Sequence, residues 1–161
     1  TKTIAWFRNP GKAGGEWKQT VIDTAGSVEF AFLVDLNNDG QAREILPQFG
    51  GKVHTAYYEL VNGKFEKRIV SPENFGHGIG AGDLNKDGKM DILTPAGWLE
   101  APHWTLHKSF PAALKSVSYM HVLDVNGDGR NDIVTGHAHD YGFYWLEQKT
   151  DGMFELRMID D

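Results

Sequence analysis

The sequence predicts an all-β fold, and three observations support this prediction. Apolar and polar residues alternate with period two over several short stretches rich in β-branched and aromatic residues, as they do in antiparallel strands. Nineteen of the 161 residues are Gly, about 12% against about 7% in an average protein, which indicates many tight turns. No stretch shows the 3.6-residue periodicity of an amphipathic helix. Together these observations disfavour a helical bundle.

The composition is that of one folded, acidic domain. The 161 residues match the size of a single ordinary domain, and 40% apolar residues provide enough material for a core. Sixteen Lys and Arg against 22 Asp and Glu give a net charge of −6, which argues against nucleic acid as a partner. The absence of Cys excludes disulfides and thiolate metal sites. No run approaches the roughly 20 apolar residues of a membrane span, so we expect no membrane insertion.

An aspartate-rich motif occurs three times along the chain. Its first residues are Asp35, Asp83 and Asp124, at intervals of 48 and 41 residues. Each motif lies between two short apolar stretches, and an aromatic stretch with a turn follows. Each full unit therefore predicts four strands: one into the Asp-rich loop, one out of it, and an aromatic hairpin. We expect the strands that leave the loops at 44–47, 91–94 and 132–135.

A repeated four-stranded unit of about 40 to 50 residues is typical of a β-propeller blade, so we predict a β-propeller of four-stranded antiparallel blades. We expect the outer strands of a partial blade at 1–28 and full blades at 29–72, 73–113 and 114–161. This is about three and a half blades, and closed propellers have about four to eight. We therefore expect further blades, from the same parent protein or a partner chain, to complete a ring of seven.

The second and third Asp-rich loops have the residue types of a calcium site. Asp, Asn, Asp, Gly and Asp occupy positions 1, 3, 5, 6 and 9 of each loop. Alternate side chains of a tight loop converge on one point, and Gly at position 6 permits the sharp turn. Three carboxylates, an amide oxygen and the carbonyl of position 7 form an oxygen shell that suits Ca²⁺. The predicted ligands are Asp83, Asn85, Asp87, Lys89 and Asp91 in the second loop, and Asp124, Asn126, Asp128, Arg130 and Asp132 in the third.

The first loop departs from this pattern. It contains Asp35, Asn37 and Asp39, but position 9 is Arg43 and the acid is Glu44 at position 10. These four oxygen donors are candidate Ca²⁺ ligands, and the shifted acid leaves metal binding by this loop open. For every loop the alternative is a surface turn without metal, since Asp, Asn and Gly favour turns in any case.

Several histidines are placed where they can form a second site. His77, before the second loop, and His137 and His139, after the third, lie about one strand length from those loops. At about 3.3 Å per residue they reach the rim opposite the loops. His121 lies along a first strand, and we expect first strands to line the central channel. Imidazole there suits Zn²⁺ or another transition metal, and acid–base chemistry near neutral pH. The candidate catalytic residues are His77, His121, His137, His139 and Asp140, and the alternative is a set of separate loop histidines.

Two aromatic residues are candidates for ligand binding. Flat amphipathic rings suit the faces of sugars, although aromatics at alternating strand positions more often pack between blades. Trp98 lies in a loop-like stretch and Tyr141 lies beside the paired histidines, so these two are the predicted ligand-binding residues. The glycine-rich run at 76–83 superficially matches a dinucleotide-binding fingerprint. We reject that interpretation because the run leads into a loop and a strand instead of a helix.

The Asp-x-Asn-x-Asp-Gly-x-x-Asp loops between short strands resemble the FG-GAP or VCBS repeats of integrin-α-like β-propellers, and the resemblance covers essentially the whole chain. It implies that calcium ties together the two inner strands of a blade. It implies no single function, because such propellers serve as adhesion modules, lectins and enzymes. We expect a secreted protein, extracellular or periplasmic, that binds a carbohydrate or a protein.

The segments 76–102, 120–134 and 136–148 look more specifically like bacterial VCBS propellers related to the propeller of aldos-2-ulose dehydratase, a lyase that acts on keto sugars. This resemblance implies an alternative function as a metal-dependent dehydratase, with the histidines at the mouth of the channel. A His-bound metal would polarise the sugar carbonyl, and a His or Asp would remove the neighbouring proton.

Overall fold

The computed structural model describes residues 2–24, 26–51, 53–111 and 114–160. These residues form fourteen β-strands and no helix, which confirms the predicted all-β class. Accordingly, the described part of the chain contains no helix of the length and apolarity that a membrane crossing requires.

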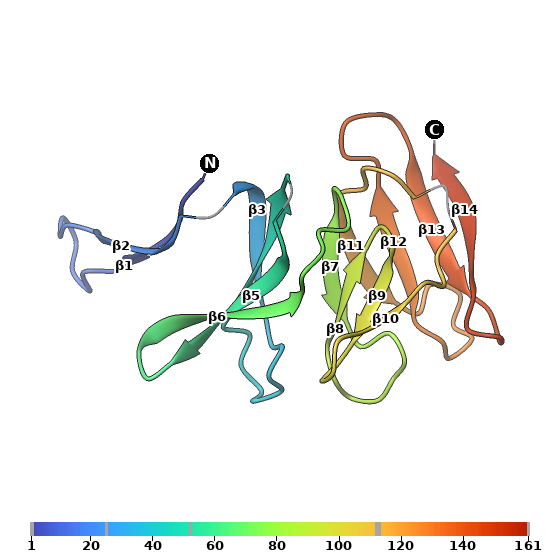
Figure 1. Cartoon of the computed structure of the whole chain (residues 1–161), viewed down its shortest axis with the longest axis horizontal. Coiled ribbons are helices and arrows are strands. Elements are labelled where there is room, and N and C mark those ends of the chain that lie inside the picture. The colour runs from blue at the N-terminus through green and yellow to red at the C-terminus, as the bar shows by residue number, and fades with distance from the viewer. Residues whose placement is uncertain (1, 25, 52, 112–113, 161) are drawn as a thin grey trace.

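The strands follow one another in chain order as a hairpin, a four-stranded sheet and an eight-stranded sheet (Figure 1). The hairpin consists of β1 (Ile4–Arg8) and β2 (Lys18–Asp23). The four-stranded sheet is antiparallel, and its strands are adjacent in chain order. They are β3 (Ser27–Val34), β4 (Glu44–Gly50), β5 (Thr55–Val61) and β6 (Lys64–Ser71).

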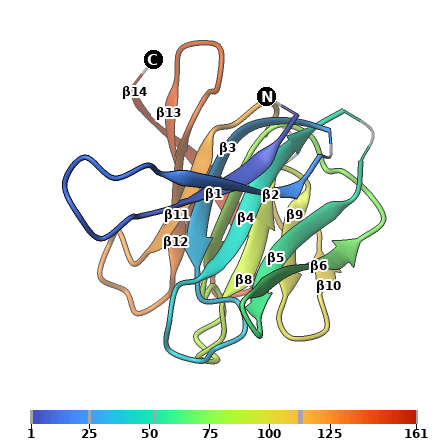
Figure 2. The same cartoon turned by 90° about the vertical axis from the view of Figure 1, so that its left-hand side faces the viewer.

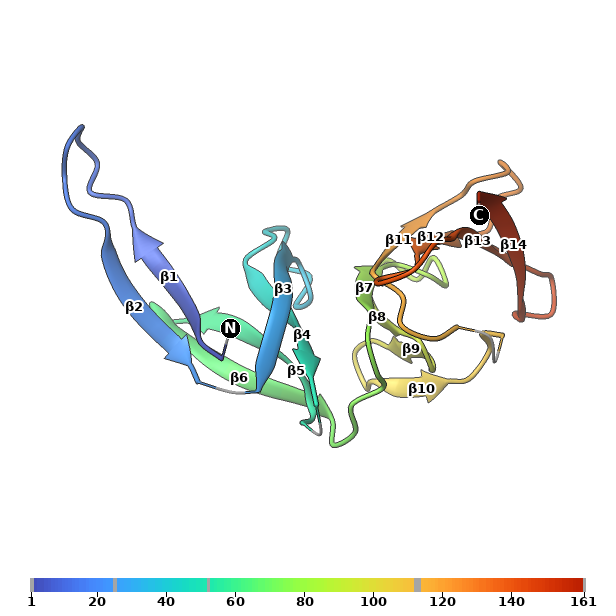
Figure 3. The same ribbon diagram turned by 90° about the horizontal axis from the view of Figure 1, so that it is seen from above.

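The eight-stranded sheet contains two antiparallel four-stranded units and curls strongly when seen from above (Figure 3). The first unit comprises β7 (Ile79–Gly82), β8 (Asp91–Thr94), β9 (Gly97–Glu100) and β10 (Thr105–His107). The second comprises β11 (Tyr119–Leu123), β12 (Asp132–Gly136), β13 (Phe143–Gln148) and β14 (Phe154–Asp160). The first strands of the two units, β7 and β11, pair in parallel.

Two glycines of β7 explain why its main chain can approach β11 so closely. A Cβ atom on Gly80 would lie 2.2 Å from the Met120 carbonyl oxygen, and one on Gly82 would lie 2.4 Å from the Val122 Cβ. Only residues without a side chain fit at such a distance. The glycine-rich run therefore serves the packing of two strands.

Apolar cores lie between each unit and the next. One joins the hairpin to the four-stranded sheet, a second joins that sheet to β7–β9, and a third joins the two halves of the eight-stranded sheet. Along the longest axis of the molecule the units lie one behind another (Figure 2). Buried pairs of residues that contribute to the three cores from opposite sides are Ile4 and Tyr58, Leu46 and Ile92, and Leu93 and Met120.

Candidate functional site

The three Asp-rich loops connect β3 to β4, β7 to β8 and β11 to β12, at the lower edge of the molecule in Figure 1. In the second loop, the two Asp83 carboxylate oxygens accept the N–H groups of Asp87, at 3.0 Å, and Gly88, at 2.9 Å. The Asn85 side-chain oxygen accepts the Asp87 N–H at 3.1 Å. The first and third loops repeat these three hydrogen bonds at the equivalent positions. The same three hydrogen bonds thus stabilise the conformation of all three loops.

The acid that ends each loop is buried and bound to main-chain amides. Asp91 is fully buried, and its two oxygens accept the N–H groups of Leu84, at 2.9 Å, and Ala101, at 3.0 Å. Burial raises the pKa of Asp91 to about 6, although these two hydrogen bonds favour the ionised form. Asp132 likewise accepts from Val125, at 3.1 Å, and Gln148, at 2.8 Å. These acids tie each loop to the following hairpin.

Glu44 provides the equivalent contact in the first loop. Its carboxylate accepts the Leu36 N–H at 3.0 Å, and position 2 of the loop supplies this amide just as it does in the other two loops. Its longer side chain compensates for the one-residue shift along the sequence. Burial also raises the pKa of Glu44, against the hydrogen bonds from the main chain. The first loop, left open by the sequence pattern, therefore has the same local architecture as the other two.

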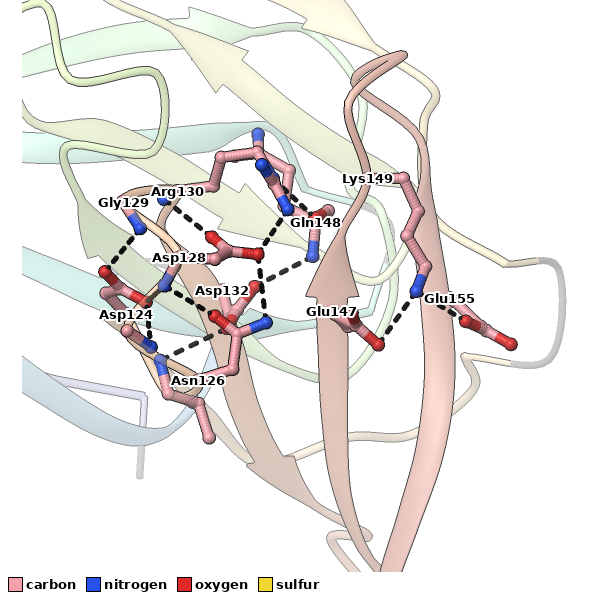
Figure 4. A network of polar contacts seen from close by, with 12 residues as sticks. Asp124, Asn126, Asp128, Gly129, Arg130, Asp132, Glu147, Gln148, Lys149 and Glu155 are labelled. Carbon is pink, nitrogen blue, oxygen red and sulfur yellow. Dashed lines mark hydrogen bonds and ion pairs between the residues drawn. The ribbon is translucent and has the colours of Figure 1, made fainter.

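A cationic side chain faces the carboxylate at position 5 of each loop. Arg43 lies 2.5 Å from Asp39, and Lys89 lies 2.7 Å from Asp87. Figure 4 shows the third loop, where Arg130 pairs with the carboxylate of Asp128. The hydrogen bond from Lys89 lowers the pKa of Asp87. The position-5 carboxylate is thus partly exposed and paired with a cation, which a calcium ion bound at this carboxylate would displace.

The donor set of the loops fits Ca²⁺ chemically. Each carboxylate oxygen can accept more than one contact, so the main-chain hydrogen bonds leave lone pairs for a cation. Positions 1, 3 and 5 supply two carboxylates and an amide oxygen in a loop whose shape is already fixed. The predicted calcium ligands of the three loops stay predictions.

A second group of side chains whose atoms could hold a metal ion combines two predicted histidines with one unpredicted carboxylate. The ligand atoms of Glu29, His77 and His139 lie within 4.8 Å of one another. The His77 Nε2 is 2.7 Å from a Glu29 carboxylate oxygen, and the His139 Nε2 is 4.0 Å from the same oxygen. The two imidazole rings meet edge to face, with centroids 4.9 Å apart. Strand β3, the segment before β7 and the β12–β13 connection each supply one of these residues.

The environment of His77 favours its charged form. Burial alone would lower the pKa of His77, but the hydrogen bonds to the Val117 carbonyl and to Glu29 raise it above the usual value. The same contact with His77 lowers the pKa of Glu29. The contact therefore favours the charged forms of both groups.

The remaining candidate catalytic residues lie outside this group. The His121 ring packs against Tyr119, with centroids 4.1 Å apart. His137 faces Tyr144, and its buried Nδ1 has no hydrogen-bond partner among the described residues. The Asp140 side chain accepts the N–H of Tyr141. The described chain thus brings together two of the four predicted histidines, together with Glu29. Glu29 could not be predicted as part of this group, because an acidic residue in an alternating strand is typical of a solvent-facing position.

The two predicted ligand-binding aromatics have opposite environments. Trp98 is 8% exposed, belongs to the core between the halves of the eight-stranded sheet, and stacks on His107 with centroids 4.3 Å apart. Tyr141 is 86% exposed beside His139. Tyr141 therefore presents a free ring face, whereas Trp98 is packed into the core.

Comparisons of the chain with protein-family models, with curated proteins and with solved structures found no match. The class that the geometry defines is an all-β protein with three similarly folded Asp-rich loops at one edge and a His/Glu group elsewhere.

Proposed function

We propose that the chain is an arc of a calcium-binding β-propeller of the FG-GAP/VCBS type, and that it serves as a module for binding a carbohydrate or a protein. The observation that carries the proposal is the shared hydrogen-bonding pattern of the three Asp-rich loops. Unrelated surface turns are not expected to share the same contacts at positions 1 and 3 and the same buried acid at the end of the loop.

The arrangement of the units supports a propeller arc. Units related by rotation about a central axis must have parallel first strands, and β7 and β11 are first strands that pair in parallel. Cores between consecutive units match the face-to-face packing of blades. Further blades, in the same parent protein or a partner chain, would complete the ring.

Calcium would be held in the second and third loops by Asp83, Asn85, Asp87, Asp124 and Asp128, among the ligands named above. It would neutralise clustered acids and tie the first two strands of each unit. Two ions would change the net charge from −6 to −2, and three would bring it to zero. An extracellular or periplasmic location would supply the roughly 10⁻⁴ to 10⁻³ M calcium at which extracellular calcium modules operate.

A calorimetric titration with Ca²⁺ after dialysis against a chelator tests this proposal. We expect two or three bound ions per chain, and the loss of one ion in each of Asp87→Ala and Asp128→Ala. Asp151→Ala is the matched control, because Asp151 caps a turn outside the three loops. Absence of calcium binding by the parent protein, together with equal melting curves in calcium and chelator, would overturn the proposal.

A second candidate function is a metal-dependent lyase that removes water from a keto sugar. The proximity of His77 and His139 favours it, because imidazole groups near a polarised carbonyl can exchange protons near neutral pH. Incubation of the protein with ketoses and Zn²⁺, followed by analysis for dehydrated products, tests this activity. Lack of product from every ketose would leave the binding module as the function.

A further inference from the structure

We infer that Glu29, His77 and His139 form a binding site for Zn²⁺ or a similar divalent transition ion, and that this ion links the four-stranded sheet to the eight-stranded sheet. This inference is independent of calcium binding by the Asp-rich loops. Glu29 belongs to β3 in one sheet, whereas His77 and His139 flank β7 and β12 in the other.

The ligand atoms of the three side chains lie within 4.8 Å of one another, and the two distances that involve Glu29 are close to those that a tetrahedral zinc ion requires. Bonds of about 2.0 to 2.1 Å place neighbouring ligand atoms about 3.3 Å apart. The Glu29 oxygen lies 2.7 Å from the His77 Nε2 and 4.0 Å from the His139 Nε2, so one distance must open and the other close by about 0.6 or 0.7 Å. The side chains of Glu29 and His139 are 48% and 66% exposed and can make these shifts.

A main-chain contact already orients His77 as a ligand. Its Nδ1 lies 2.9 Å from the Val117 carbonyl oxygen, which can only accept a hydrogen bond. Nδ1 therefore carries a proton, and Nε2, which lies 2.7 Å from Glu29, is the nitrogen that would give up its proton to bind the ion. Val117 is buried in the core of the eight-stranded sheet, so this acceptor is fixed in position. Such a second contact typically orients a metal-bound histidine and fixes its tautomer.

The donor types select the metal. Two imidazole nitrogens and one carboxylate suit Zn²⁺, whereas Ca²⁺ prefers an all-oxygen shell such as that of the Asp-rich loops. Three protein ligands leave one coordination position open for water or for an oxygen of a ligand.

Calorimetric titration with Zn²⁺ in saturating Ca²⁺ tests the inference, since calcium then occupies any sites in the loops. We expect one zinc ion per chain. His139→Ala and Glu29→Gln should each weaken zinc binding by at least about tenfold. Both positions are largely exposed, so these variants should fold. His103→Ala, at an exposed histidine outside the group, is the matched control and should bind like the parent.

Thermal melting provides a second readout of the link between the sheets. Zinc should raise the melting temperature of the parent protein and of Asp87→Ala, but not that of His139→Ala. Zinc binding by His139→Ala with the affinity of the parent would overturn the inference, as would the absence of zinc binding in calcium. Neither result depends on whether the Asp-rich loops bind calcium, because Asp87→Ala tests the loops separately.

Discussion

At the scale of single residues, Asp23 holds the N-terminal hairpin to the four-stranded sheet. Its carboxylate accepts a 2.6 Å hydrogen bond from the hydroxyl of Tyr58 and lies 2.8 Å from the ammonium group of Lys67. Tyr58 is 1% exposed. Burial acts to raise the pKa of Asp23, but the hydrogen bonds from Lys67 and Tyr58 lower it below its ordinary value. The ionised carboxylate therefore stabilises the contact.

Replacement of Asp23 tests this contact. Asp23→Ala leaves the buried Tyr58 hydroxyl without its acceptor. The free energy of unfolding should therefore fall by about 1 to 3 kcal/mol. Denaturant titration of the parent and the variant measures the difference. Glu16→Ala, at an exposed position of the same hairpin, should change stability little. Equal midpoints for Asp23→Ala and Glu16→Ala would contradict the account.

The contribution of Asp23 should also depend on pH. Because the folded protein has the lower pKa, the stabilisation is complete above the unfolded value of about 4 and disappears as the pH falls through the folded value. The difference in free energy of unfolding between the parent and Asp23→Ala should therefore be constant at neutral pH and shrink below about pH 4. A difference that stays the same down to pH 2 would refute this assignment.

At the scale of elements, the parallel pair β7 and β11 joins two four-stranded units into one sheet. The local strands could be predicted from the sequence, because alternation and turn residues are local signals: the strand expected at 91–94 is β8. The pairing of β7 with β11 could not be predicted, since local signals do not show which strand, distant in the sequence, will lie beside β7. The grouping of Glu29 with His77 and His139 also depends on contacts between distant segments, so it could not be predicted. That Glu44 takes the place of the final acid of the first loop became evident only from its hydrogen bond with the Leu36 N–H.

A methyl group at Gly80 should force β7 and β11 apart. Its Cβ would meet main-chain atoms of Met120, so the strands must separate, and overpacking of this kind costs about 1 to 3 kcal/mol or more. Gly136→Ala is the control, because a Cβ there meets nothing closer than 3.5 Å. Thermal unfolding should show a large decrease for Gly80→Ala and a small one for Gly136→Ala. Equal melting temperatures for the two variants would contradict the close packing of β7 against β11.

At the scale of the whole molecule, the units follow an arc whose two ends carry exposed apolar side chains. Phe7 and Val21 are exposed on the first hairpin, and Phe143 and Ile159 on the last. Exposed apolar groups on terminal strands favour association with further strands. The proposed additional blades would cover these faces.

The chain on its own should therefore associate as its concentration rises. Sedimentation velocity over a range of concentrations measures this association. Val21→Lys and Ile159→Lys should reduce it, because each places a charge on one of the exposed ends. A protein that stays monomeric at every concentration would contradict the interpretation that further strands pack on these two faces.

The proposed calcium sites in the Asp-rich loops are tested most directly by anomalous diffraction from crystals grown in calcium. We predict anomalous peaks at the second and third loops, about 2.3 to 2.6 Å from oxygens of Asp83 and Asp87 and of Asp124 and Asp128. Well-ordered loops without an anomalous peak at either site would contradict the claim.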